Sequence, residues 1–195
     1  MARPRAQDYD DKRDAMLHHA ARLFALQGYD RTSLSDIAAV LGVSKTLFYH
    51  YYNSKDALLF DIIHSHLAKL VDVAEAAHAS VANPRERLHR VICAILDCYR
   101  DADAEHKIQI NHLGQLPEHQ QKTLKQLERR LVDVMVSNVA AINPNVKKEL
   151  IKPLAMSIFG TLNWKYMWFR EGGTVSAEDY AELVTTLFSN GIRSF

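Results

Sequence analysis

The sequence predicts an all-α protein with an N-terminal three-helix head that contains a helix-turn-helix and a larger C-terminal helical body. Apolar residues recur at helical spacing along most of the chain, and no segment shows the two-residue alternation of a strand. Glycine, or asparagine followed by proline, interrupts the pattern where helices end or restart. We place the head at residues 1–55 and the body at residues 56–195.

Composition restricts the class of protein. The 195 residues can bury a sizeable core, and 48% hydrophobic with 24% charged residues is typical of a globular chain. The net charge of +1 excludes a generally basic surface, so DNA affinity would have to come from locally placed cations. No apolar run could span a bilayer and the N-terminus lacks a secretory signal, so we expect a cytoplasmic protein with no membrane partner.

Catalytic and metal-binding patterns are missing from the sequence. None of the ten histidines shows the i,i+4 pairing of a helical zinc site, and there is no glycine-rich phosphate loop or nucleophile elbow. Cys93 and Cys98 lie five residues apart on one predicted helix, where they cannot easily meet. Buried, reduced thiols are the commoner arrangement, with a redox switch as the alternative. We predict a non-enzyme without metal or cofactor.

The first helix is predicted from Tyr9 to Gln27, and Gly28 ends it. Its apolar side consists of Ala20, Leu23, Phe24 and Leu26. Arg3 and Arg5 precede the helix. These arginines form either a basic arm that follows a DNA groove or a plain disordered start.

Two short helices follow between residues 32 and 58. Ser33 with Asp36 three residues later is a capping box for the first, and Gly42 ends it. Ser44 caps the second, which we expect to reach Tyr51. The predicted head core is Leu17, Ala21, Phe24, Leu34, Ile37, Leu41, Val43 and Phe48.

The spacing of this pair is typical of a DNA-binding helix-turn-helix. Ala38 precedes Gly42 by four residues and Phe48 follows it by six, which supplies a small residue at the helix crossing, a turn glycine and an apolar anchor. Leu47 is predicted to pack inward beside Phe48. The remaining face is basic, aromatic and hydroxylated, which suits phosphates and base edges, and consists of Lys45, Thr46, Tyr49 and His50. An ordinary core hairpin is the alternative.

The body is predicted to contain further amphipathic helices. Their approximate bounds are 55–79, 84–100, 104–113, 117–142, a long helix from about 145 to 170, and a last helix after the capping box of Ser176 and Asp179. Pro153 is expected to bend the long helix or to mark a second start.

The body supplies candidates for a ligand pocket, which needs apolar space with a few polar groups. They are Tyr99, His112, Met135, Phe159, Asn163, Trp164, Met167 and Trp168. Trp164 and Trp168 are one turn apart and can share a face. For these tryptophans, packing in the core or in a dimer seam is the alternative.

The last helix carries an apolar row, here called the dimer stripe: Tyr180, Leu183, Val184, Leu187, Phe188 and Gly191. We expect the final two helices to bury it against their copies in a four-helix seam, with burial inside one subunit as the alternative. A twofold dimer would present two recognition helices to successive major grooves, roughly 34–36 Å apart, of a palindromic double-stranded operator.

The run from Ala21 to Leu59 resembles the head of the TetR family of transcriptional regulators. It holds the glycine and aromatic residue of Gly28-Tyr29, then Thr32-Ser33, Asp36-Ile37-Ala38, Gly42-Val43-Ser44 and the segment from Tyr49 to Leu58. The resemblance implies about nine helices, a homodimer and a regulatory cavity in the body. It also implies a repressor that binds operator DNA and a small apolar ligand.

Carried over to this sequence, the resemblance implies that Thr32 and Lys55 hold DNA phosphates. It places Ser44, Lys45, Thr46, Tyr49 and His50 on the recognition helix. Many members have glycine at the position of Thr46, and we expect its methyl and hydroxyl groups to contact a thymine or a phosphate.

The resemblance in the body covers shorter segments than the resemblance in the head. The segments 158–164 and 167–173, with Leu116-Pro117 and the apolar pattern of 124–132, are similar to members that control fatty-acid, sterol or aromatic-acid degradation and respond to acyl-CoA thioesters. The sequence leaves two alternatives: a repressor of a multidrug efflux pump that binds aromatic compounds, and a small-molecule binding or scaffolding protein whose head no longer binds DNA.

Overall fold

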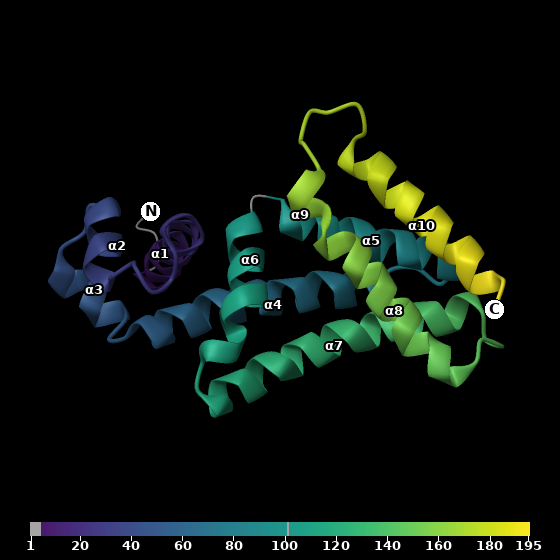
Figure 1. The fold of residues 1–195 in the computed structure, drawn as a ribbon, viewed down its shortest axis with the longest axis horizontal. Coiled ribbons are helices and arrows are strands. Elements are labelled where there is room, and N and C mark those ends of the chain that lie inside the picture. The colour runs from purple at the N-terminus through teal and green to yellow at the C-terminus, as the bar shows by residue number, and fades with distance from the viewer. Residues whose placement is uncertain (1–4, 101) are drawn as a thin grey trace. The chain divides into compact units, whose positions relative to one another are not determined.

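The computed structural model describes residues 5–100 and 102–195, with side chains from residue 12 onward. Every regular element in these ranges is a helix, which confirms the predicted fold class (Figure 1). The helices are α1 (Arg5–Gln27), α2 (Leu34–Val40), α3 (Lys45–Tyr51), α4 (Lys55–Ala79), α5 (Pro84–Tyr99), α6 (Asp103–His112), α7 (Glu118–Ile142), α8 (Lys148–Asn163), α9 (Lys165–Trp168) and α10 (Ala177–Arg193), with a 3-10 turn at Leu113–Gln115.

Two helix boundaries differ from the predictions. α1 begins at Arg5, earlier than the predicted start at Tyr9. The other arginine of the predicted basic arm, Arg3, lies outside the described residues. The expected long helix from 145 to 170 is shorter: α8 continues through Pro153 and ends at Asn163, and α9 follows separately. Extended backbone at Phe169 ends α9 and brings the Phe169 ring to 5.9 Å from the Tyr180 ring, so aromatic packing against α10 replaces further helix here.

The chain divides into two compact units. The head unit is residues 1–67 with 101–124, and the body unit is residues 68–100 with 125–195. The head unit is therefore larger than the predicted 1–55, because it includes the first half of α4 and all of α6. The unit boundary falls inside α4, which runs without interruption from Lys55 to Ala79.

The head unit has a core drawn from α1 to α4. Its buried residues include Leu17, Ala21, Phe24, Leu34, Ile37, Ala38, Phe48, Leu58 and Ile62. Leu41 and Val43 are half-buried, and Leu26 is exposed. The prediction for Leu26 was wrong because the buried row of α1 repeats through Leu17, Ala21 and Phe24, and Leu26 falls off that face.

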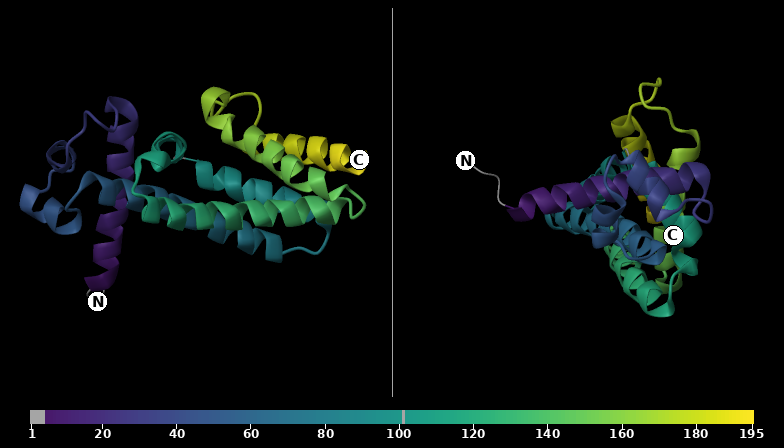
Figure 2. Two further views of the ribbon diagram at one scale, coloured as in Figure 1. Left: turned by 60° about the horizontal axis from the view of Figure 1, so that its bottom comes forward. Right: turned by 90° about the vertical axis from the view of Figure 1, so that its left-hand side faces the viewer.

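In the body unit the second half of α4, α5 and α7 run side by side, and α8 and α10 complete the bundle (Figures 1 and 2). Their shared core includes Val71, Ile92, Met135, Ile158 and Val184. Arg130 of α7 contacts Glu75 of α4 through Nη2 at 2.8 Å. The buried amide of Asn138 donates to the Val134 carbonyl at 2.8 Å and contacts His78 Nδ1 at 3.0 Å. None of the described helices is long and apolar enough to cross a membrane.

Candidate DNA-binding interface

α2 and α3 form the predicted helix-turn-helix, and their ends are fixed by local hydrogen bonds. The Asp36 amide donates to Ser33 Oγ at 3.1 Å, and Asp36 Oδ2 accepts from the Ser33 amide at 2.8 Å. Hydrogen bonds from the Ser33 side chain and backbone lower the pKa of the Asp36 carboxyl. Gly42 adopts φ +66°, a left-handed conformation that glycine reaches without strain, and the Val43 amide then donates to the Ala38 carbonyl at 3.1 Å.

The capping box predicts a measurable stability difference. Replacing Ser33 with alanine should lower the free energy of unfolding by about 1 kcal/mol, because the Asp36 amide loses its acceptor. Urea unfolding followed by circular dichroism measures the change. Ser35→Ala in the same helix is the matched control and should stay within about 0.5 kcal/mol of the wild type. Equal losses for the two variants would contradict the proposed contribution of the cap.

α3 presents the predicted face to solvent. Ser44 accepts a hydrogen bond from the Leu47 amide at 3.1 Å, and Lys45, Thr46, Tyr49 and His50 are exposed. Phe48 is fully buried and anchors the helix. Leu47 is 43% exposed, so the prediction that it packs inward was wrong. A seven-residue helix has one narrow buried face, and Phe48 with Tyr52 one turn later occupies it.

Thr32 and Lys55 are both engaged inside the head unit. Thr32 is 1% exposed and its hydroxyl donates to the Gly28 carbonyl at 2.9 Å, so its side chain lies inside the fold and not at the predicted phosphate-binding surface. The buried position follows from the turn after α1, which needs an internal donor for the Gly28 carbonyl. Lys55 Nζ donates to the Tyr29 carbonyl at 2.7 Å and to the Asp30 carbonyl at 3.3 Å.

A polar network holds α4 against the turn and the first helix. Tyr29 Oη donates to Asp56 Oδ1 at 2.7 Å, and burial, reinforced by Asp56, raises the pKa of Tyr29. Asp61 Oδ2 accepts from Arg13 Nη2 at 2.7 Å and from Tyr52 Oη at 3.2 Å. Through Tyr52, which directly follows α3, these contacts join the start of α4 to the helix-turn-helix.

α6 is a further element of the head unit, and its contact with α1 was not predicted from the sequence. α6 packs against α1, where His18 Nδ1 lies 2.9 Å from Glu105 Oε1. His112, predicted as a ligand contact, belongs to this unit and its ring lies 5.5 Å from the Tyr29 ring. His112 is half-buried, and this ring contact accounts for its position without a ligand.

The other predicted ligand contacts lie in the body unit and divide into two groups. Met135 and Phe159 are buried in the core, and Tyr99 Oη donates to Asn163 Oδ1 at 2.7 Å. Burial raises the pKa of the Tyr99 phenol. Trp164, Met167 and Trp168 are exposed. Trp164 directly follows α8, and Met167 and Trp168 lie in the short helix α9, so their assignment as ligand contacts stays a prediction.

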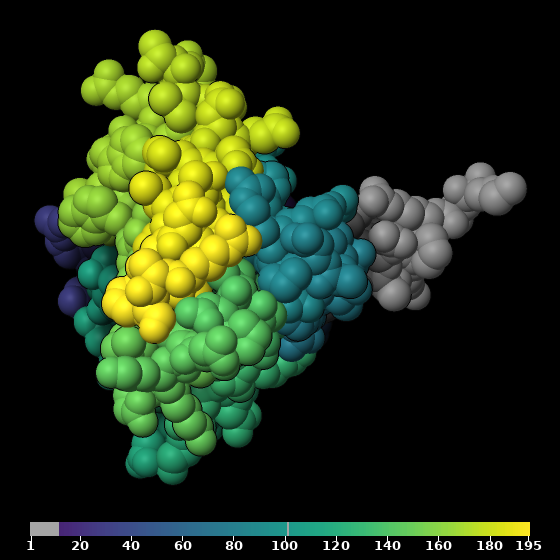
Figure 3. Space-filling view, turned by 90° about the vertical axis from the view of Figure 1, so that its right-hand side faces the viewer, coloured from purple at the N-terminus to yellow at the C-terminus, as the bar shows by residue number. Residues whose placement is uncertain are grey.

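The dimer stripe is also divided. Tyr180 and Val184 are buried in the body unit, where Tyr180 Oη donates to the Thr161 carbonyl at 3.1 Å, and Phe188 packs against the core. Leu183 and Leu187 are 51% and 61% exposed. Figure 3 shows α10, in yellow, lying across the surface of this unit. Burial within one subunit therefore accounts for part of the stripe and leaves an apolar edge on its outer side.

Both cysteines lie on α5 in the body unit. Cys93 and Cys98 are free thiols, and burial raises the pKa of each, which disfavours the reactive thiolate. Within residues 12–100 and 102–195, no group of three or more His, Cys, Asp or Glu side chains is placed to hold a metal ion.

Comparison with known proteins covers both units. A family model described as bacterial regulatory proteins, tetR family, matches residues 16–62, and one described as tetracyclin repressor-like, C-terminal domain, matches residues 81–192. The fold is similar to that of a TetR-family transcriptional regulator from Bordetella parapertussis 12822, with 31% identity, a TM-score of 0.86 and coverage of 92% of this chain and 95% of that one.

Two further relatives carry information about ligands and regulation. The crystal structure of AibR in complex with isovaleryl coenzyme A and operator DNA is 26% identical, with a TM-score of 0.77 over 91% of this chain and 98% of that one. The HTH-type transcriptional repressor KstR2 of Rhodococcus jostii (strain RHA1) is 24% identical over 201 residues, which span 100% of this chain and 98% of that protein.

Proposed function

This chain belongs to the TetR family of bacterial transcriptional regulators, and we propose that it is a dimeric repressor released from its operator by an acyl-CoA or a similar apolar ligand. The observation that carries the proposal is the exposed face of α3. Lys45 and His50 supply charge and hydrogen bonds, Thr46 and Tyr49 supply hydroxyl groups, and the buried Phe48 holds them in place. These groups match the chemistry of phosphates and base edges.

In the proposed complex α3 enters the major groove. Leu47 joins the predicted DNA contacts, because an exposed apolar side chain on this face suits the methyl group of thymine. Lys55 keeps a positioning role through the Tyr29 and Asp30 carbonyls, and the third donor of its ammonium group is available to a phosphate. Thr32 acts through the turn that it stabilises and does not contact DNA through its hydroxyl.

The proposed dimer uses the apolar edge of the body unit. Leu183 and Leu187 on α10, and Trp164 directly after α8, are exposed. Exposed apolar groups arranged in a row are typical of a protein interface. A twofold seam of α8 and α10 with their copies would cover them and bring two heads to one palindromic operator.

Ligand binding in the body is proposed to favour a state whose two heads no longer match the operator spacing. The ligand weakens DNA binding by its differential affinity for the two states, commonly ~1–3 kcal/mol. α4, which belongs to both units, and α6, which packs on α1, are the elements proposed to carry the change. The acyl-CoA assignment is supported by the complex of the similar AibR with isovaleryl coenzyme A.

Fluorescence anisotropy with labelled DNA from the protein's own promoter region tests this function. Tyr49→Ala should weaken operator binding by about tenfold or more, because each recognition helix loses a contact worth ~1 kcal/mol and the dimer has two. Lys122→Ala, an exposed i,i+4 partner of Glu118, is the control and should bind as the wild type does. An acyl-CoA should release the wild type from DNA.

Each part of the proposal has its own contradicting outcome. If Tyr49→Ala bound the operator as tightly as the wild type, the assignment of α3 as the recognition helix would be wrong and a scaffolding protein would be favoured. Operator binding that no CoA thioester or free acid alters would remove the ligand assignment and leave the DNA-binding function in place.

A further inference from the structure

A groove of about 620 Å³ lies between α7 and α8, entirely within the body unit. Its volume is within the range of small-molecule sites, about 300–1,000 Å³. The groove is open to solvent along the two helices. It contains none of the ligand contacts predicted from the sequence.

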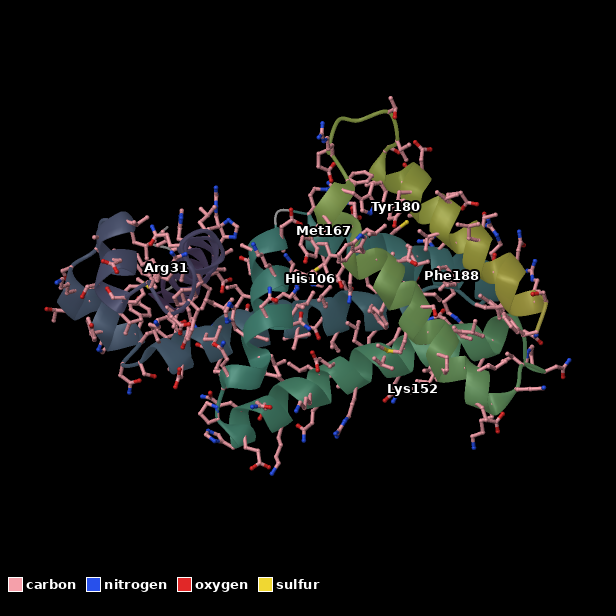
Figure 4. The ribbon with its side chains drawn as sticks, viewed as in Figure 1. Arg31, His106, Lys152, Met167, Tyr180 and Phe188 are labelled. Carbon is pink, nitrogen blue, oxygen red and sulfur yellow. The ribbon has the colours of Figure 1, made fainter. Side chains whose placement is uncertain are left out.

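The rim of this basic groove is cationic. Lys125 and Arg129 face it from α7, and Lys148 and Lys152 face it from α8. Each pair is spaced i,i+4, so both helices direct two cations to one side. Lys152 is seen at the edge of α8 close to α7 in Figure 4.

Two carboxylates, Glu128 and Asp133, also line the groove, which leaves an excess of two positive charges. The whole chain has a net charge of only +1, so this concentration of cations is local. A site with this excess favours a ligand that carries more than one negative charge.

The floor of the basic groove is apolar. Val132 and Val136 of α7 and Ile151 of α8 line it and also pack against the body core. Met156 of α8 also lines the groove, and its unbranched thioether side chain adapts readily to different apolar shapes. Apolar surface bounded by cations is complementary to an amphiphile with an apolar tail and a multiply charged head.

We propose that the basic groove binds the phosphate-bearing head of an acyl ligand, with the start of the acyl chain on the Val132–Val136–Ile151 floor. The inference rests on the proposed function for its ligand class and assigns the residues that recognise the charged end. Arg129 offers a planar fork that matches phosphate geometry, and Lys148 and Lys152 add point charges. A fatty acid carries one carboxylate and would use only part of this charge.

Isothermal titration calorimetry on the full-length, DNA-free protein tests the site with octanoyl-CoA, free CoA and octanoate. The double variant Arg129→Ala/Lys152→Ala should weaken the binding of octanoyl-CoA and of free CoA by roughly tenfold, because it removes two partly exposed charge contacts. Octanoate should be affected less, because it lacks the phosphates. Met156→Gln should weaken the binding of octanoyl-CoA and leave the affinity for free CoA unchanged.

The matched control is Arg90→Ala/Lys122→Ala. It removes the same charge from two exposed i,i+4 ion pairs outside the groove and should bind all three probes as the wild type does. Equal affinities in the two double variants would overturn the groove assignment, and so would a wild type that binds neither octanoyl-CoA nor CoA.

Operator binding without ligand, measured on the same proteins, separates this inference from the proposed function. If the wild type binds operator DNA but Arg129→Ala/Lys152→Ala leaves the ligand affinity unchanged, the groove assignment is rejected and the repressor function is not. A wild type that does not bind operator DNA would reject the repressor function, whatever the groove binds.

Discussion

Replacing Leu187 with glutamate is expected to convert the dimer to monomers and to abolish tight operator binding. Leu187 is 61% exposed on α10, one turn from the exposed Leu183. At Gly160 on α8 and Gly191 on α10 an added Cβ would meet no atom within 4 Å, so both glycines leave room for another helix to approach. A carboxylate buried unpaired in this seam would cost about 3–5 kcal/mol, which weakens the dimer by roughly two to three and a half orders of magnitude for each of its two copies.

Loss of the dimer should affect DNA binding strongly because each monomer has one recognition helix. Two linked half-sites commonly gain 10²–10⁴-fold in avidity, so we expect operator affinity to fall by at least about a hundredfold. Analytical ultracentrifugation gives the oligomeric state and anisotropy gives the operator affinity. The Leu187→Glu monomer should keep its helical circular dichroism, since Leu187 contributes little to the core of its own subunit.

Leu26→Glu is the matched control for this variant. Leu26 is an exposed leucine on α1 in the head unit, outside the proposed seam. It should leave the sedimentation of the dimer unchanged. A dimer that survives Leu187→Glu would show that α10 is not the dimer interface, and the exposed edge of α10 would then need another partner.

The helix-turn-helix could be predicted from the sequence because its signals are local. A capping box at Ser33, a left-handed glycine at Gly42 and the spacing to Phe48 each act within a few residues, and the structure has all three. The extent of the head unit was not predictable in this way. It depends on contacts such as His18 with Glu105 and Arg13 with Asp61, whose partners are 87 and 48 residues apart.

In the body, too, contacts between distant residues could not be predicted from local sequence signals. The helical spacing of the dimer stripe predicted an apolar face, but spacing alone does not distinguish Val184, which is buried, from Leu187, which is exposed. The width of the buried face is set by α5 and α8, which pack against α10. The basic groove is another product of tertiary packing, because Arg129 and Lys152 share a site only when α7 and α8 lie together.

Leu47 and Phe48 provide the sharpest test of the recognition helix, because two adjacent apolar residues have opposite environments. Phe48 is fully buried, and its ring lies 6.0 Å from the Tyr52 ring. Phe48→Ala should cost about 3–5 kcal/mol of unfolding free energy through lost burial and a cavity. Since typical domains have only about 5–15 kcal/mol in total, we expect the head to unfold at physiological temperature and operator binding to be lost.

Leu47→Ala removes a comparable apolar side chain from the neighbouring, exposed position. Its unfolding free energy should stay within about 0.5 kcal/mol of the wild type, while its operator affinity falls through loss of the proposed thymine contact. Urea unfolding and anisotropy on the same preparations separate the two effects. If both variants lost stability equally, Leu47 would pack inward after all, and the orientation of α3 that exposes Lys45, Tyr49 and His50 would be wrong.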